Sequence, residues 1–301
     1  MLSIVVLGTA AGGGLPQWNC GCQNCRAARS SPERQLNQAS IAVSADRENW
    51  FLINASPDLR QQIANTPVLH PKAGELRHSP IAGVILSNGE VDAVTGLLSL
   101  REGSPFSLYA HDRVLSLLAD NSIFNVLKPA LVPRISIAAG VSFEPTLTGG
   151  TPSGLDILPF VAPGKAALFV EEQSAHQEGD TLGFVITDRA TGNSFVFLAA
   201  CAAVTPEVEP YLRGAKLVFF DGTLWRDDEL ITLGLGAKTG QRMGHISMKE
   251  AMPALEELGI GTKFFLHINN SNPVLDPASP ERKEAEAGGW HIPAEGMEIT
   301  L

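Results

Sequence analysis

The layout of this chain is clearest in the stretch Gly83-Val-Ile-Leu-Ser-Asn-Gly-Glu-Val-Asp-Ala-Val-Thr-Gly96. Residues 83–86 form a short apolar run, which predicts a buried strand. The loop that follows carries Glu90 and Asp92, and a helix is predicted over residues 94–100. The stretch therefore reads as a strand–loop–helix unit with two carboxylates in its loop.

The same alternation of strands and helices extends outward from this unit in both directions. Towards the N-terminus we predict a first strand at 3–8, one or two helical turns at 22–29, a hairpin of strands at 39–45 and 50–54, and a helix at 59–64 capped by residues 55–58. Towards the C-terminus we predict strands at 107–110, 181–187, 194–198, 217–220, 263–268 and 297–301, helices at 112–118 and 247–258, and β-hairpins between 128 and 172. No linker divides the sequence. The layout predicts an α/β (α+β) fold in one domain, residues 1–301, with two sheets covered by helices on both outer faces.

Composition narrows the function classes. The 301 residues are 44% hydrophobic and carry a formal net charge of −10. An acidic chain is repelled by nucleic-acid phosphates, so general nucleic-acid binding is not expected. No apolar run is long enough to span a membrane, and no signal peptide is recognisable, so we expect a cytoplasmic protein without a membrane partner.

Three of the four cysteines, Cys20, Cys22 and Cys25, lie within six residues. In a reducing cytoplasm such a cluster indicates a metal site, and zinc prefers four tetrahedral ligands that include thiolates. We expect His267, which ends the last core strand, to be the fourth ligand. A structural zinc is the favoured interpretation. A catalytic metal and three reduced thiols without function remain the alternatives.

Five blocks resemble one family: residues 6–25, 96–103, 220–225, 243–248 and 267–273, including Phe220-Asp-Gly-Thr-Leu-Trp225 and Met243-Gly-His-Ile-Ser-Met248. Together they resemble the PqqB family of pyrroloquinoline quinone (PQQ) biosynthesis, within the metallo-β-lactamase superfamily. The blocks run from the first strand almost to the C-terminus. The resemblance implies a four-layer αββα sandwich of metallo-β-lactamase type.

The superfamily motif Thr-His-x-His-x-Asp-His-x-x-Gly corresponds to residues 87–96. Its aspartate and glycine match Asp92 and Gly96, but its three histidine positions hold Asn88, Glu90 and Ala93. A two-zinc hydrolase depends on those imidazoles, so the departure disfavours hydrolysis. The remaining candidates resemble a mononuclear non-haem iron(II) site with open positions for oxygen: Glu90, Asp92, Asp221, His176, His245 and His267.

Five of these six candidates also have a structural interpretation. Asp92 and His245 could cap the helices that follow them, and Asp221 could bond the Gly222-Thr223 turn. Glu90 and His176 could be solvated loop residues. These alternatives stay open at the level of the sequence.

The resemblance implies iron-dependent hydroxylation of the tyrosine ring in a small PQQ precursor derived from a cross-linked Glu and Tyr of a peptide. Arg101 or Arg34 could bind the carboxylates of this precursor through a bidentate fork. The alternative is a binding or carrier protein that assists transport of PQQ or its precursor without catalysis. A homodimer is also expected.

Overall fold

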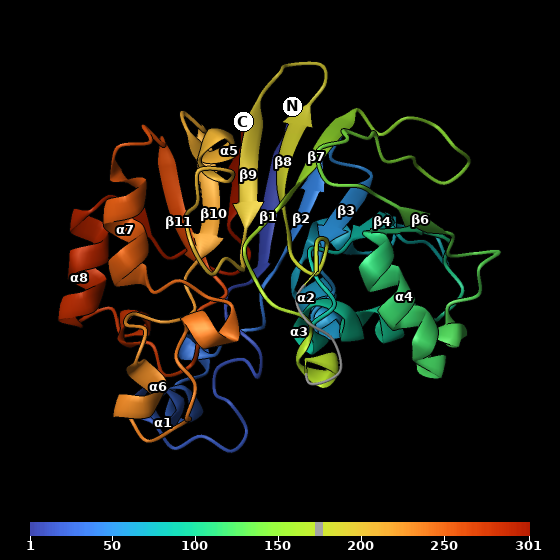
Figure 1. The fold of residues 1–301 in the computed structure, drawn as a ribbon. Helices are drawn as coiled ribbons and strands as arrows, with labels where there is room; N and C mark the ends of the chain where they lie inside the picture. The colour runs from blue at the N-terminus through green and yellow to red at the C-terminus, as the bar shows by residue number, and fades with distance from the viewer. Residues whose placement is uncertain (172–176) are drawn as a thin grey trace.

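The computed structural model describes residues 1–171 and 177–301, which form two sheets (Figure 1). The first sheet has the order β13-β1-β2-β3-β4-β5-β6. Its strands are β1 (Ser3–Gly8), β2 (Ser40–Ser44), β3 (Trp50–Ile53), β4 (Ile81–Ile85), β5 (Ser107–Ala110), β6 (Arg134–Ser136) and β13 (Glu298–Thr300). The second sheet has the order β12-β11-β10-β9-β8-β7. Its strands are β7 (Leu155–Val161), β8 (Leu182–Asp188), β9 (Ser194–Leu198), β10 (Leu217–Asp221), β11 (Thr262–Leu266) and β12 (Trp290–His291).

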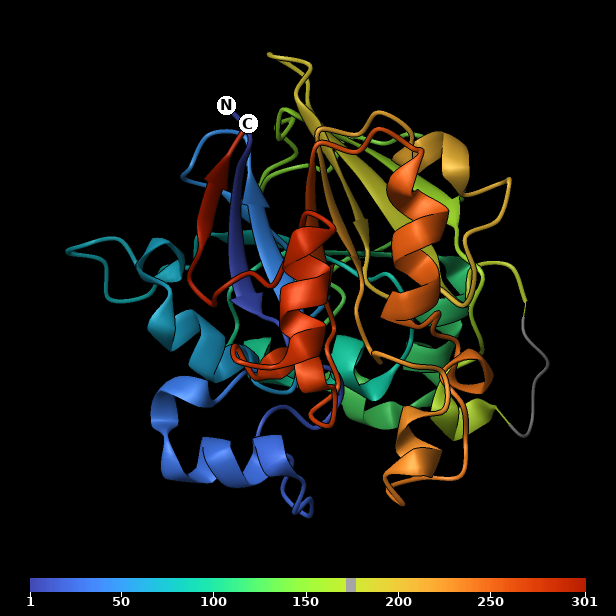
Figure 2. The same ribbon diagram turned by 90° about the vertical axis from the view of Figure 1, so that its left-hand side faces the viewer.

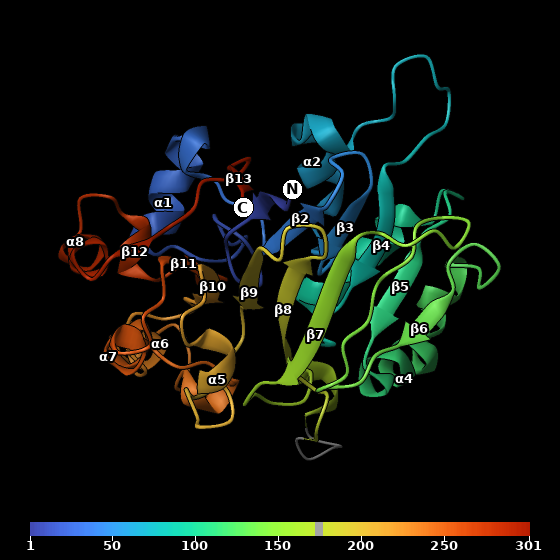
Figure 3. The ribbon, with the colours of Figure 1, turned by 90° about the horizontal axis from the view of Figure 1, so that it is seen from above.

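Helices cover the outer face of each sheet, as the view from above shows (Figure 3). Helices α2 and α4 lie against the first sheet, and α5, α7 and α8 lie against the second. The helices are α1 (Gln23–Ser30), α2 (Leu59–Asn65), α3 (Val91–Val94), α4 (Asp112–Asp120), α5 (Glu209–Leu212), α6 (Glu229–Thr232), α7 (Met248–Glu256) and α8 (Pro280–Ala287). The predicted four-layer αββα sandwich is confirmed.

The layers follow from the alternation of side chains along the strands. In β1, Ile4 and Val6 enter the core between the two sheets. Val5 and Leu7 point to the other side and enter the core under the helices of the first sheet. A strand that is buried on both faces therefore appears in the sequence as one continuous apolar run.

The strand directions place a group of loops at one end of the sandwich. Strands β3 to β6 are parallel, and so are β9 to β12. Loops after the carboxyl ends of parallel strands are the usual position of ligand sites. Strands β9 and β10 end at the lower end in Figure 1, where α1, α3 and α6 also lie. The chain termini lie together at the opposite end (Figure 2), where Leu2 and Leu301 exchange two backbone hydrogen bonds.

Two predicted elements differ from the structure. The helix predicted over 94–100 begins earlier, as α3 at Val91, and continues as a 3-10 helix, Thr95–Leu100. The hairpins predicted between 128 and 172 form only in part: residues 143–157 pair as an antiparallel hairpin through isolated bridges, Phe143 with Ile157 and Thr146 with Pro152. β6 pairs in parallel with β5, and β7 pairs with β8, so the two strands of this region extend different sheets. Short apolar runs between glycines and prolines indicate strands but do not identify their partners.

Of the one or two helical turns predicted at 22–29, the structure has two, in α1, which begins within the cysteine cluster. Its N-cap is Cys22, whose Sγ accepts a hydrogen bond from the backbone N–H of Cys25. No helix in the described ranges is long and apolar enough to cross a membrane.

Candidate metal centres

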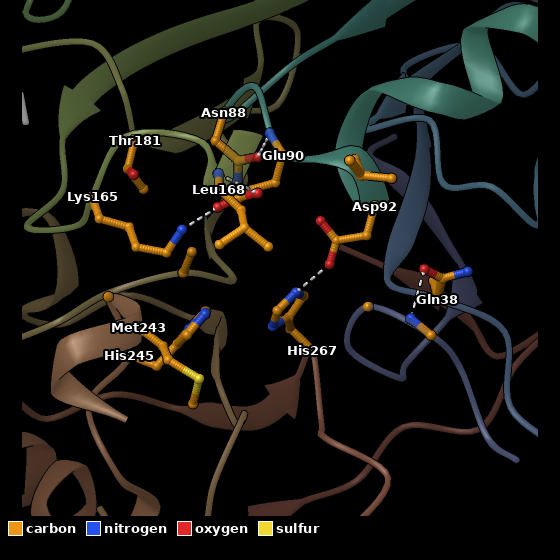
Figure 4. Close-up of a pocket in the computed structure, with 15 residues that line it drawn as sticks. Gln38, Asn88, Glu90, Asp92, Lys165, Leu168, Thr181, Met243, His245 and His267 are labelled. Atoms are coloured by element: carbon orange, nitrogen blue, oxygen red, sulfur yellow. Dashed lines mark hydrogen bonds and ion pairs between the residues drawn. The ribbon is translucent and has the colours of Figure 1, made fainter. Parts of the chain in front are cut away.

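Four potential ligand residues converge at the loop end of the sandwich. Asp92 lies in the first turn of α3, Asp221 ends β10, His267 follows β11 directly, and His245 lies in the loop before α7. They surround a cavity of about 470 Å³ (Figure 4). The side chains of Asp92, His245 and His267 are 19%, 15% and 17% exposed, whereas Asp221 is fully buried. The cavity therefore exposes one carboxylate and two imidazoles, with the second carboxylate behind them.

Asp221 is held by four donors. Its Oδ2 accepts hydrogen bonds from the backbone N–H of Cys201 at 2.8 Å and lies 2.7 Å from Nδ1 of His245. Its Oδ1 accepts from the backbone N–H of Thr223 at 3.0 Å and from the Thr223 hydroxyl at 2.7 Å. A buried carboxylate with this many partners is well compensated for its lost hydration. Asp221 is therefore suited to orient His245 from behind.

The Thr223 hydroxyl links both imidazoles. Its Oγ1 lies 3.0 Å from Nδ1 of His245 and 2.9 Å from Nδ1 of His267. Because its single proton goes to Asp221, the hydroxyl can only accept hydrogen bonds from the two rings. Both histidines then carry a proton on Nδ1, so Nε2 is the nitrogen of each ring that a metal could bind, and at His267 the metal would replace the proton shared with Asp92. Such a partner on the other ring nitrogen is the usual support for a histidine that binds a metal.

Asp92 contacts His267 on one side of the cavity, with Oδ2 at 2.9 Å from Nε2 (Figure 4). Burial opposes ionisation of Asp92, but the hydrogen bond and charge of His267 outweigh it and lower the carboxyl pKa. Burial also disfavours the imidazolium, but the bond to Asp92 and the charges of Asp92, Asp221 and Glu90 raise the pKa of His267. Each group therefore favours the charged form of the other.

The backbone of His267 has a left-handed conformation, with φ of 60°. This conformation is costly for a residue with a Cβ, by about 1 kcal/mol or more. Neighbouring backbone hydrogen bonds fix it: the N–H of Ile268 donates to the carbonyl of Thr9, and the N–H of Ala11 donates to the carbonyl of Ile268. The N–H of Asn269 donates to the carbonyl of Thr223. The strain turns the imidazole away from the line of β11 and towards the cavity.

These donors fit a mononuclear metal site. Asp92, His245 and His267 all line the cavity, and two histidines with one carboxylate are the combination of ligands typical of non-haem iron(II). The ligand atoms of Asp221, His245 and His267 also lie within 4.8 Å of one another. Since Asp221 is buried and does not line the cavity, Asp92 is the better placed carboxylate.

The cysteines form a second potential metal site. The Sγ atoms of Cys20, Cys22 and Cys25 lie within 4.8 Å of one another. Asn270 closes the group, with its side-chain nitrogen 3.1, 3.6 and 3.2 Å from the three sulfurs in that order. The oxygen and nitrogen of an asparagine amide occupy equivalent positions. Rotation of the amide by 180° would place Oδ1 opposite the three sulfurs, where it could serve as a fourth ligand.

The thiols differ in acidity. Burial, together with the neighbouring Cys22, raises the pKa of Cys25 to about 11. Burial also acts against ionisation of Cys20, but hydrogen bonds from Cys22, Cys25 and Asn270 outweigh it and lower the pKa of that thiol. Zinc binds thiolates, so occupation of this site requires loss of the Cys25 proton.

The structure separates His267 from the cysteines. Its ring nitrogens contact Asp92 and Thr223, and Asn270 occupies the open side of the sulfur cluster. The prediction that His267 is the fourth ligand of the thiolate site is therefore wrong. Closeness in the sequence was not a guide here, because the side chain of His267 faces the cavity whereas that of Asn270, three residues later, faces the cysteines.

The remaining predicted residues lie apart from the ligand group. Glu90 lines the cavity but is bound to Lys165, 2.5 Å from Oε1 to Nζ. Arg101 lines a separate surface pocket and bonds the carbonyl of Leu98, and Arg34 is an exposed residue of a short 3-10 helix, so neither reaches the cavity. His176 lies outside the described residues.

Sequence reasoning missed three residues with clear positions in these sites: Lys165, Thr223 and Asn270. Thr223 and Asn270 lie inside the family-like blocks 220–225 and 267–273, next to the predicted Asp221 and His267. That adjacency was a usable signal. Lys165 lies in a Pro-Gly-rich loop, where nothing in the local pattern distinguishes it.

Known proteins of one family are similar to this chain over its whole length. Residues 49–268 match the β-lactamase superfamily domain. A coenzyme PQQ synthesis protein B from Rhodopseudomonas palustris is 62% identical, and one from Gluconacetobacter diazotrophicus is 50% identical, each over the full length of both chains. A crystal structure of Zn²⁺-bound PqqB from Methylobacterium extorquens superposes with a TM-score of 0.93 at 44% identity, over 99% of this chain and 100% of that one. A diphosphatase of the PhnP family shares the fold, with a TM-score of 0.70 at 18% identity over 99% of this chain and 96% of that one.

Proposed function

Since this chain belongs to the coenzyme PQQ synthesis protein B family of the β-lactamase superfamily, we propose that within PQQ biosynthesis it is an iron-dependent oxygenase. Its proposed substrate is a small precursor derived from the cross-linked Glu and Tyr of a peptide, and its proposed reaction is hydroxylation of the tyrosine ring. One oxygen atom of dioxygen enters the ring, and the other leaves as water after reduction by two electrons from an external reductant. The observation that carries this proposal is the set of Asp92, His245 and His267 on one cavity. Two imidazoles and one carboxylate leave part of a metal's coordination sphere open for other ligands.

Iron(II), when bound by these three residues, would supply the activation of dioxygen. The protein's part is to hold the ligands and to shape the cavity. Asp221 and Thr223 fix both rings with Nδ1 protonated, so that each Nε2 is available to a metal. Leu168 and Met243 give the cavity apolar surface that suits a phenol ring.

The residues at the three histidine positions of the superfamily motif also favour one metal rather than two at this cavity. Asn88 and Glu90 stand at two of the histidine positions of the superfamily motif. The N–H of Glu90 donates to Asn88, and the carboxylate of Glu90 is bound to Lys165. Ala93, at the third, is buried and carries no donor. A second hydrolytic metal would therefore lack its imidazoles.

We further propose that the three cysteines hold a structural zinc with Asn270 as the fourth ligand. The relative from M. extorquens is zinc-bound. Three closely spaced thiolates are among the preferred ligands of zinc. A site with four protein ligands leaves no open position, which suits a role in holding the loop before α1 to the loop after β11.

The test is product formation under labelled oxygen. Zinc-loaded protein is reconstituted anaerobically with iron(II), mixed with a Glu–Tyr-type substrate and a two-electron reductant such as ascorbate, and exposed to ¹⁸O₂. We expect an iron-dependent product that is heavier by one labelled oxygen atom, and we expect Asp92→Ala to abolish it while zinc content stays unchanged. Binding of the substrate without any labelled product, at full iron occupancy, would overturn the oxygenase proposal and favour a carrier protein.

A further inference from the structure

We propose that Lys165 binds a carboxylate of the substrate and that Glu90 is the positioning residue that aims the Lys165 ammonium into the cavity. The inference rests on the proposed function, because it concerns the substrate of the same cavity. It gives that substrate a defined chemistry: an anion whose carboxylate lies on the side of the cavity opposite the metal ligands.

Charge distribution in the cavity singles out Lys165. Among the described residues that line it, Lys165 is the only lysine or arginine. Figure 4 shows Lys165 and Glu90 meeting on one side, while the contact between Asp92 and His267 lies on the other. If a metal is bound by Asp92 and His267, the side with Lys165 and Glu90 remains for polar groups of a substrate.

The ammonium of Lys165 is held in place by two acceptors and keeps one N–H donor for a ligand. Its Nζ lies 2.5 Å from Oε1 of Glu90 and donates to the carbonyl of Ala166 at 3.1 Å. An ammonium has three N–H donors, so two acceptors leave one donor for a ligand. With 20% of its side chain exposed, Lys165 can meet a carboxylate in a partly desolvated setting, where a charge-assisted bond is strong.

Glu90 is itself fixed, which is why it can orient Lys165. Its Oε2 accepts a hydrogen bond from the backbone N–H of Leu168 at 3.1 Å, and its own N–H donates to Asn88 at 2.9 Å. The loop that carries Lys165 is packed as well, since a Cβ on Gly244 would approach the Cγ of Lys165 to 3.2 Å. The pair therefore presents a preorganised cation, which lowers the entropic cost of binding an anion.

The experiment compares two probes on zinc-loaded full-length protein without iron, by isothermal titration calorimetry. One probe is the dipeptide L-Glu-L-Tyr, and the other is its analogue with carboxamides in place of both carboxylates. The wild type should prefer the acid. Lys165→Met should weaken binding of the acid roughly 10- to 100-fold, as expected for a hydrogen bond between charged groups, and should change binding of the amide by less than about 3-fold. Lys165→Arg should recover most of the lost affinity.

Lys238→Met is the matched control. Lys238 pairs with Glu171 at 3.1 Å and is 44% exposed, but it does not line the cavity. Its replacement should leave the binding affinity for both probes unchanged. Equal affinity of the wild type for acid and amide, including no binding of either, would overturn the proposal, and so would an equal loss for both probes in Lys165→Met. Because no iron is present, these outcomes are independent of whether the protein hydroxylates its substrate.

Discussion

Replacement of Thr223 by valine tests the hydrogen-bond network that supports the histidines. Valine keeps the shape of threonine but removes the hydroxyl, which donates to Asp221 at 2.7 Å and lies 3.0 and 2.9 Å from His245 and His267. Both residues at the centre of the network are buried, with Thr223 5% exposed and Asp221 0%. Asp221 keeps two backbone donors and His245.

Loss of a hydrogen bond to a buried charge costs about 1.5 to 3 kcal/mol, and the two imidazoles lose a common acceptor as well. We therefore expect Thr223→Val to lower the free energy of unfolding by about 2 to 3 kcal/mol. We also expect it to weaken metal binding at the cavity roughly 10- to 100-fold, the usual effect of removing a partner of a ligating histidine.

The assay has two parts: chemical denaturation, and titration of zinc-loaded protein with Co²⁺ followed by its visible absorption. Thr223→Ser is the control, because serine retains the hydroxyl. It should bind Co²⁺ within about 3-fold of the wild type. If Thr223→Val binds Co²⁺ as tightly as Thr223→Ser, the hydroxyl does not orient the rings, and the reasoning is refuted.

Three further predictions concern groups outside this network. Burial raises the pKa of Glu295 to about 7 despite hydrogen bonds from Asn37, and the charge of Asp58 adds to the effect. The folded protein therefore keeps a proton that the unfolded chain loses first, so the free energy of unfolding should fall by about 1 to 2 kcal/mol as the pH rises from about 5 to 7. Denaturation curves should show a smaller slope with pH for Glu295→Gln, and an unchanged slope would contradict the assignment. Because the pKa of Cys25 is about 11, zinc uptake must release its proton. Competition titrations should give an affinity that rises about 10-fold or more per unit of pH between about 6 and 8, whereas a flat profile would exclude this coupling. Asn270→Ala should weaken zinc binding roughly 10-fold or more while Asn270→Asp retains it, and equal retention by both would remove Asn270 from the ligand set.

The four layers could be predicted from the sequence because their strands are apolar on both faces. The runs at 3–8, 194–198 and 217–220 leave few alternatives to buried strands, and each forms as one. The region 128–172 was not predictable in the same way. The partners of β6 and β7 are set by contacts with β5 and β8, which are distant in the sequence, and not by the local glycines and prolines.

Residue types in the candidate sites were largely predictable, but their grouping was not. Asp92, Asp221 and His245 were expected to act together, and the structure brings them to one end of the sandwich. His267 and Asn270 are three residues apart, yet they face different clusters, because the left-handed backbone of His267 turns its ring away from the chain direction. Lys165 comes from a loop with no pattern of its own, so only the folded chain reveals its contact with Glu90.

We propose that this protein has two metal sites with separate ligands, a zinc site at the cysteines and an iron site at the cavity. The direct measurement is the metal content per chain, by inductively coupled plasma mass spectrometry, after anaerobic loading with both metals. We predict about one zinc and one iron for the wild type, loss of zinc alone in Cys22→Ser, and loss of iron alone in His245→Ala. Zinc at both sites, no uptake of iron, or loss of both metals in either variant would contradict it.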